Sequence, residues 1–475
     1  MLAVAMGVGA CAELCASPAG AEDVGLRTVS VDSTVTVGTL RPLSGVNGGP
    51  AAEFGLKAAG DAEAAAGVDG TAAYRAARVD LVRVHNEFGP GDVDAIFPDM
   101  SADPNNAASY DFAATDRLIA SIKTAGAEPL FRIGRSLGSP ADPPVDLDKY
   151  ANIARHIVMH YNLGWDKGSR KAIRYWEIWN EPDSNLYWSG TPQQYYALYE
   201  KIAHAIEAVD PQALIGGPAL ARPLDGGAYR EGLIDFIRLH RLPLDFFSWH
   251  FFPVDIDDPR DFVTIARQLR IILDMRGFGS AFNVLDEWNA DLTAHDMPAP
   301  ARAAFAASAL IYMLGGPIDH QAFYRGDSVL RSVGGKPAAV GQALTAFGQL
   351  KDTPVLVGTD GGDDAGFALI AGRSADRRLV QILISNYQVS PEPSGSGDAL
   401  NITLPARRTL EYRDNGGYEA TITLPSSRKY RIKRYRIAEN ANFSLVDQTV
   451  QSGPIVHLRA VLPPPGVDFI VIEAN

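Results

Sequence analysis

The sequence predicts an α/β protein, a (β/α)8 TIM barrel followed by a C-terminal β-sandwich domain. Between residues 36 and 350, short apolar runs rich in β-branched and aromatic residues alternate with helical patterns. After Leu350 the helical patterns end, and short strands separated by Gly, Pro and Ser turns follow. Repeated strand–helix units are typical of a closed parallel barrel, and short strands between turns are typical of a sandwich.

The elements are predicted in chain order from this alternation. The barrel strands are expected at 36–43, 79–85, 128–134, 173–180, 213–218, 244–250, 281–288 and 320–325. From the second strand onward each is followed by a helical pattern, at 111–126, 147–161, 191–210, 230–241, 260–277, 299–316 and 336–350. The sandwich strands are expected at 379–388, 400–406, 418–425, 429–437, 454–463 and 467–475, with 26–37 as a further strand.

These patterns divide the chain into four predicted parts. Residues 1–21 are a signal peptide, 22–35 an N-terminal strand that joins the β-sandwich, 36–350 the barrel and 351–475 the β-sandwich. The signal peptide is expected because an uncharged apolar run precedes an Ala-Gly-Ala cleavage site, although no Lys or Arg precedes the run. We therefore expect a secreted or periplasmic protein, with lipidation at Cys11 as the lesser alternative.

The composition narrows the classes of partner. The net charge of −13 argues against nucleic acid as the main partner. After the N-terminal run no apolar stretch reaches about 18 residues, so no membrane span is expected. Both cysteines, Cys11 and Cys15, lie in the predicted signal peptide, which leaves the mature chain without disulfides or thiol catalysis. No cofactor is predicted, and the oligomeric state is left open.

Two glutamates lie where predicted barrel strands end. In "YWEIWNEPD" (175–183), Pro182 stops the fourth strand directly after Glu181, and "NVLDEWN" (283–289) ends the seventh strand near Glu287. Barrel active sites lie at the C-terminal strand ends, so the two carboxylates are expected to face each other. Cleavage of a glycosidic bond needs such a pair, with pKa values that differ. The alternative for Glu181 is a charged residue at the exit of a buried strand.

Several motifs in combination resemble glycoside hydrolase family 39, within the clan of (β/α)8 retaining glycosidases. These motifs are "NEP" (180–182), "WSGT" (188–191) before a tyrosine-rich helix, "GGP" (216–218), "LPLDFFSWH" (242–250), "LDEWN" (285–289), "VRVH" (82–85) and "KRYRIAENANFS" (433–444). The resemblance covers roughly residues 36–475. It implies a retaining glycosidase acting on an oligo- or polysaccharide, by default a β-xylosidase-like exo-enzyme.

The resemblance also implies a role for each candidate residue. Glu181 would be the general acid/base, and Glu287 would be the nucleophile that forms a covalent glycosyl-enzyme. Asn180 would hydrogen-bond the sugar 2-hydroxyl, and Arg83 would keep Glu287 ionised. The other candidates would line the substrate site, namely His85, His250, Phe252, Trp288, Tyr324 and Arg325.

Two stretches depart from the family pattern. "HFF" (250–252) places Phe252 where many members have a tyrosine that hydrogen-bonds the nucleophile, and "AFYRGDS" (322–328) replaces a Tyr–Trp–Thr-like run. Both lie in the expected glycone pocket, so the sugar specificity is left open. The alternative to a β-xylosidase is an enzyme for arabinose-containing side chains or a bacterial exopolysaccharide.

Some residues have plainer alternatives. Trp179 is expected in the barrel core rather than as a sugar platform. Glu177 and Asp286 are structural candidates, and Asp286 should point away from Glu287 because strand neighbours face opposite sides. A metal site is the weaker alternative, from three side chains, namely His85, Glu87 and His250. For the whole chain the alternatives are a non-catalytic carbohydrate-binding barrel and a metal-dependent hydrolase.

Overall fold

The structure is a computed structural model. It describes residues 25–51, 69–85, 90–136, 140–253, 258–290, 297–330, 337–390, 410–411 and 413–474. The predicted signal peptide, Cys11, Glu87 and the predicted strand at 400–406 lie outside these residues. Among the described helices, none is both long and apolar enough to cross a membrane.

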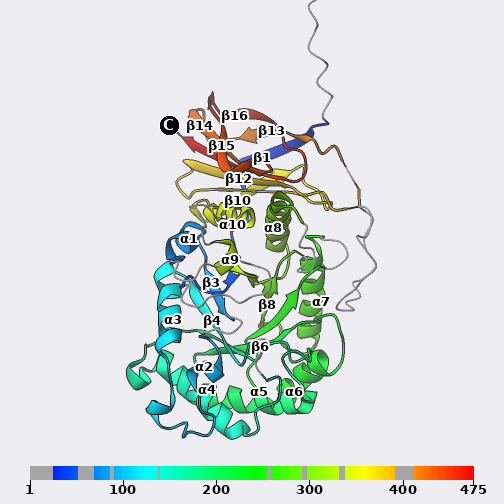
Figure 1. Cartoon of the computed structure of the whole chain (residues 1–475). Helices are drawn as coiled ribbons and strands as arrows, with labels where there is room; N and C mark the ends of the chain where they lie inside the picture. The colour runs from blue at the N-terminus through cyan, green and yellow to red at the C-terminus, as the bar shows by residue number, and fades with distance from the viewer. Residues whose placement is uncertain are drawn as a thin grey trace, which may run out of the picture.

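Eight parallel strands close into a barrel, which together with a second strand-rich domain confirms the predicted fold class (Figure 1). The strands are β2 (Val46–Asn47), β3 (Leu81–Val84), β4 (Glu128–Ile133), β5 (Tyr175–Ile178), β6 (Leu214–Leu220), β7 (Phe246–Phe251), β8 (Phe282–Trp288) and β9 (His320–Phe323). Every neighbouring pair is parallel, including the closing pair of β2 and β9. All C-terminal strand ends therefore meet at one mouth of the barrel.

Helices surround the barrel. They are α1 (Thr71–Ala76), α3 (Ala113–Ala125), α4 (Leu147–Asn162), α5 (Pro192–Glu207), α6 (Leu233–His240), α7 (Asp261–Met275), α8 (Ala299–Leu314) and α10 (Ala339–Gln349), with short α2 (Val93–Ile96) and α9 (Gly326–Val329). Local sequence sets their ends. Thr191 and Gln194 form a capping box at the start of α5, and Gly126 ends α3 at φ +90°.

The predicted first barrel strand at 36–43 is wrong. Residues Arg27–Thr39 form β1, which pairs with β10 and β13 in the second domain. The barrel begins instead at β2. The alternating sequence of β1 fits a strand with one solvated face. Gly45, just before β2, lies so close to the Gln321 carbonyl oxygen that a Cβ would clash, so the true first strand is Gly-rich and lacks the usual strand pattern.

The second domain is one nine-stranded sheet in the order β15–β14–β17–β12–β11–β10–β1–β13–β16. Its C-terminal strands are β10 (Val355–Asp360), β11 (Phe367–Arg373), β12 (Leu379–Asn386), β13 (Gly417–Thr423), β14 (Lys429–Ala438), β15 (Ala441–Ser452), β16 (Ile455–Val461) and β17 (Gly466–Ala474). The sheet folds over into two layers (Figure 1). Val456 of β16 and Ile432 of β14 belong to one buried cluster, so the folded sheet is a sandwich.

The sandwich rests on α8, the helix that follows β8. Ser385 Oγ donates to the Ala304 carbonyl oxygen at 2.7 Å, and Ser308 Oγ donates to that of Gly366 at 2.8 Å. The second domain is therefore joined by hydrogen bonds to the helix that follows the strand carrying Glu287.

Candidate active site

The backbone around Glu181 is held in an unusual conformation. After β5 ends at Ile178, Trp179 has φ +74° and Glu181 has φ +46°. Side-chain-bearing residues seldom adopt such values, and they persist where surrounding contacts fix them. The Glu181 N–H donates to the Ala219 carbonyl oxygen at 3.0 Å. The strand end and this bond place the Glu181 carboxylate at the mouth, with 14% of the side chain exposed.

Asp286 and Glu287 both reach Arg83, which corrects the expectation that Asp286 points away. Arg83 Nη1 lies 2.6 Å from Glu287 Oε1, and Arg83 Nε lies 2.8 Å from Asp286 Oδ2. The pairing of β8 with β7 is irregular here, since Leu285 opposes Trp249 but Glu287 opposes His250. A bulge of this kind re-aims a side chain and breaks the two-residue alternation.

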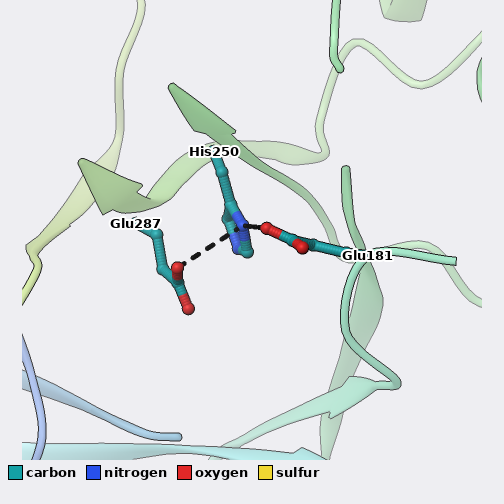
Figure 2. A group of neighbouring side chains, drawn as sticks. All are labelled: Glu181, His250 and Glu287. Atoms are coloured by element: carbon teal, nitrogen blue, oxygen red, sulfur yellow. Dashed lines mark hydrogen bonds and ion pairs between the residues drawn. The ribbon is translucent and has the colours of Figure 1, made fainter. Parts of the chain in front are cut away.

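His250 lies between the two glutamates (Figure 2). Its Nδ1 is 2.7 Å from Glu181 Oε1 and 3.6 Å from Glu287 Oε2. One ligand atom from each of the three side chains falls within 4.8 Å of the others. The carboxylates of strands β5 and β8 therefore face each other across the mouth, as the sequence predicts.

Arg83 is the central cation of the site. It is fully buried, and its guanidinium also contacts Glu177 Oε2 at 2.7 Å and donates from Nη2 to Asn180 Oδ1 at 2.7 Å. Burial alone would lower the pKa of Arg83, but Asp286, Glu177 and Glu287 raise it. Arg83 therefore stays charged and binds three carboxyl groups together.

The carboxyl groups around Arg83 differ in their pKa. Burial acts to raise the pKa of Glu177, but Arg83 and hydrogen bonds from Asp286 and Ser248 outweigh it, so this pKa is lowered. Burial raises the pKa of Asp286 well above its usual value, and Arg83 offsets only part of this shift. These opposite shifts favour the negative charge on Glu177 over Asp286.

Burial also raises the pKa of Glu287. His250 and Arg83 act against this shift, and the Glu181 carboxylate adds to it. The expectation that Arg83 favours the ionised form of Glu287 agrees with their 2.6 Å contact. Its effect is nevertheless smaller than the combined effect of burial and the second glutamate.

Both predicted histidines are buried and neutral. Burial, Arg83 and Arg132 lower the pKa of His85 well below its usual value. Arg132 Nε donates to His85 Nδ1 at 3.2 Å, so the ring proton lies on Nε2, which is 3.4 Å from Glu287 Oε1. Burial lowers the pKa of His250 to about 4.

Four further predicted residues, Asn180, Phe252, Tyr324 and Arg325, make contacts of different kinds. Asn180 is buried, and its Nδ2 has no hydrogen-bond partner among the residues that the structure describes. Phe252 and Tyr324 meet edge to face, with ring centroids 6.0 Å apart. Arg325 is buried and bound to Asp327 through two hydrogen bonds of 3.0 and 2.7 Å.

Trp288 does not line the site, contrary to the sequence-based expectation. It is fully buried, its Nε1 donates to Gln321, and its ring packs edge to face on Phe262 and Phe323. The bulge that turns Asp286 inward leaves Trp288 on the outer face of β8. Trp179 is likewise buried and packs on Trp188, as expected for a core residue.

Four residues that contribute to the site were not singled out from the sequence. Arg132 orients His85, and Ser248 Oγ donates to Glu177 Oε1 at 2.6 Å. Asn47 lies 3.5 Å from Arg83 Nη1, and Tyr187 lies beside His85, with centroids 6.2 Å apart. A charged residue within the apolar run "EPLFRIG" is a signal that could have identified Arg132.

The metal alternative concerns a different set of residues from the predicted one. The predicted set was His85, Glu87 and His250. Glu87 lies outside the described residues, so the structure does not test this set. Glu181, His250 and Glu287 are close enough to hold a cation. Neutral imidazole and carboxylate are ligands that zinc accepts.

Comparisons with known proteins identify similar glycoside hydrolases. The sequence model of Glycosyl hydrolases family 39 matches residues 71–265. A β-xylosidase of Caldicellulosiruptor saccharolyticus is 34% identical over 121 residues, 24% of this chain and 22% of that protein. One of Geobacillus stearothermophilus is 28% identical over 174 residues, 33% of each. The matched segments thus span a third or less of these relatives.

Solved structures match over nearly the whole chain. A glucosidase from Croceicoccus marinus is 31% identical with a TM-score of 0.84, covering 96% of this chain and all of that one. A GH39 enzyme from Xanthomonas axonopodis pv. citri has a TM-score of 0.72 at 16% identity, covering 95% of this chain and 98% of that one, and so supports the fold alone. The barrel and its facing glutamates define a TIM-barrel glycoside hydrolase. The chain belongs to glycosyl hydrolases family 39.

Proposed function

We propose that the protein is a retaining glycosidase that acts by double displacement. The observation that carries this proposal is the approach of Glu181 and Glu287, whose nearest ligand oxygens lie within 4.8 Å. Retaining enzymes hold their two carboxyl groups about 5–5.5 Å apart, whereas inverting enzymes leave about 6.5–9.5 Å for a water molecule. The short separation favours direct attack on the sugar by one carboxylate.

In the first step Glu287 attacks the anomeric carbon while Glu181 gives its proton to the departing glycosidic oxygen. An ester bond to Glu287 forms as the glycosidic bond breaks. In the second step Glu181 takes a proton from water, which attacks the same carbon and releases Glu287. We assign the nucleophile to Glu287 and the acid/base to Glu181 because Arg83 and His85 both face Glu287. Donors directed at a carboxylate stabilise it both when it attacks and when it leaves.

Asn180 completes this proposal on the substrate side. Its Oδ1 is held by Arg83, and its Nδ2 is a buried donor without a partner among the described residues. A buried donor without a partner is costly, and a sugar hydroxyl would satisfy it. We assign this contact to the 2-hydroxyl, where hydrogen bonds strengthen in the transition state.

The substrate proposed first is a β-xyloside, since two β-xylosidases match part of the chain. A β-glucoside is the second candidate, because the solved structure that matches the whole chain at 31% identity is a glucosidase. Arabinose-containing side chains and a bacterial exopolysaccharide remain alternatives. A non-catalytic carbohydrate-binding barrel would be expected to lack one catalytic carboxylate, and both are present.

The test is a panel of aryl glycosides of xylose, glucose and arabinose with the purified protein. Proton NMR of the first-formed sugar gives its anomeric configuration. The proposal expects hydrolysis of at least one β-glycoside with retention. Inversion would overturn the nucleophile assignment, and no hydrolysis of any glycoside would favour the non-catalytic barrel.

Export to the periplasm or the medium is also a proposal, supported by the apolar run Leu2–Ala12 and the Ala-Gly-Ala at 19–21. N-terminal sequencing of the protein from its native host should give Glu22 as the first residue. Retention of residues 1–21 in a cytoplasmic protein would contradict it.

A further inference from the structure

The strained backbone at Glu181 has a counterpart on the neighbouring strand. Ala219, which accepts the Glu181 N–H, has φ +58°, and its own N–H donates to Ser248 Oγ at 2.9 Å. Both residues adopt a left-handed conformation without being glycine. Such conformations persist only where the surroundings determine them, so the loops after β5 and β6 must be held together.

Asp183 makes the contacts that join these two loops. Its Oδ1 accepts the Ala221 N–H at 3.0 Å, and its Oδ2 accepts the Arg222 N–H at 2.8 Å. In return Arg222 Nη2 donates to the Asp183 carbonyl oxygen at 2.7 Å. Asp183 lies two residues after Glu181, and Ala221 lies two residues after Ala219, so these bonds directly follow the strained pair.

We propose that Asp183 is a positioning residue for Glu181, acting by fixing the loop after β6 that holds the Glu181 main chain. The inference rests on the proposed function, in which Glu181 transfers protons. Hydrogen bonds from N–H groups to a carboxylate are roughly twice as strong as neutral ones. An asparagine at this position offers one acceptor atom, so it satisfies only one of the two N–H groups.

The charge of Asp183 is sensitive to pH. Burial raises its pKa to about 6, the Glu181 carboxylate adds to the shift, and the N–H groups of Arg222 and Ala221 oppose it. Among the described residues, His250, Tyr195 and Tyr229 also interact electrostatically with Asp183. When Asp183 gains a proton, its hydrogen bonds from the Ala221 and Arg222 N–H groups weaken. The fall of kcat/KM at acid pH should therefore contain an ionisation that Asp183→Asn removes.

The experiment compares two leaving groups in Asp183→Asn, using the 2,4-dinitrophenyl and phenyl β-D-xylosides, or the corresponding glucosides if only these are hydrolysed. The value of kcat/KM reports the step that expels the leaving group. General acid catalysis contributes about 10²–10⁴-fold, and displacement by about 1 Å costs up to about 10²-fold. We expect kcat/KM to fall about 10–100-fold for the phenyl glycoside and far less for the dinitrophenyl glycoside, which needs little protonation.

Asp225→Ala is the matched control. Asp225 is half-exposed, and its carboxylate lies 3.5 Å from the same Arg222 side chain. Its backbone N–H donates to the Arg222 carbonyl oxygen, a bond that Asp225→Ala leaves in place. Its substitution should leave both substrates unchanged. Thermal unfolding of all variants checks that they are folded.

Equal losses for both leaving groups, or no loss, in Asp183→Asn would overturn the proposal. If that variant does not fold, Arg222→Ala removes the bond to the Asp183 carbonyl oxygen together with the contact to Asp225, for which Asp225→Ala is the control. A smaller loss with the same leaving-group dependence is expected. If Arg222→Ala shows no leaving-group dependence, the proposal is also overturned. Glu181→Ala is measured alongside, and absence of leaving-group dependence in that variant would refute the proposed function instead.

Discussion

Arg83 Nη1 lies 2.6 Å from Glu287 Oε1, and neither side chain is more than 7% exposed. A buried carboxylate next to a buried guanidinium is stable as an ion only while both partners remain. The chain has Phe252 where many family members have a tyrosine donor, and among the described residues Arg83, His85 and His250 face Glu287. This relationship underlies the first two predictions.

Arg83→Ala should reduce kcat by more than about 100-fold, the scale for loss of a key electrostatic contact. Steady-state kinetics on the best aryl glycoside measures this. Arg78→Ala is the control, because Arg78 pairs with Asp352 on the exposed surface and should not affect kcat. A loss below tenfold in Arg83→Ala would mean that this residue does not support Glu287.

The Glu177 and Asp286 carboxyls should respond differently to replacement by their amides. The pKa of Asp286 is raised and that of Glu177 is lowered, so Asp286→Asn places a neutral donor where the proton is favoured. Glu177→Gln removes the negative charge that Arg83 contacts at 2.7 Å. We expect the loss of kcat in Glu177→Gln to exceed that in Asp286→Asn by at least about tenfold. The reverse order would place the charge on Asp286.

His250 should make stability depend on pH. Its pKa is lowered from 6.5 to about 4, so between these values the unfolded chain binds a proton that the folded protein excludes. Its contribution to stability is therefore lost as the pH falls from about 6.5 to about 4, by roughly 3 kcal/mol in total.

Urea unfolding of the wild type and His250→Asn at pH 7 and pH 4.5 measures this term. Carboxyl groups with raised pKa, such as Asp183, act in the opposite direction but are present in both proteins. The wild type should lose more stability than the variant over this range. Equal losses would indicate that His250 is protonated in the folded protein.

Removal of metal ions should leave the activity unchanged. Cleavage by a pair of glutamates requires no metal, although Glu181, His250 and Glu287 are close enough to hold one. Dialysis against EDTA followed by assay is the measurement. Loss of activity that zinc restores would favour the metal-dependent hydrolase.

The sequence predicts the barrel well because seven strands have strong apolar runs in regular alternation with helices. It fails at the first strand, since β2 has only two residues and lies in a Gly-rich stretch. Three strands of the second domain, β10, β11 and β15, were also missed. β15 has an irregular, largely exposed pattern, because it is an edge strand with little to bury.

The site was only partly predicted, because some of its residues are placed by strand position and others by local irregularities. Glu181 and Glu287 lie at strand ends, where position alone indicates function. The inward turn of Asp286 and the outward turn of Trp288 depend on a bulge, which strict alternation does not predict. The contact of Asp183 with Ala221 and Arg222 joins two loops whose spacing the sequence does not reveal.

The most direct test of the account is the configuration of the product that Glu181→Ala and Glu287→Ala form with azide. Without an acid/base, the glycosyl-enzyme forms from an aryl glycoside with a good leaving group and then stalls, because no base activates water. Azide needs no base, so Glu181→Ala should give a glycosyl azide of retained configuration. Without the nucleophile, azide attacks directly, so Glu287→Ala should give the opposite configuration. Exchanged outcomes would reverse the two roles, and near-native turnover of both variants without azide would contradict the account.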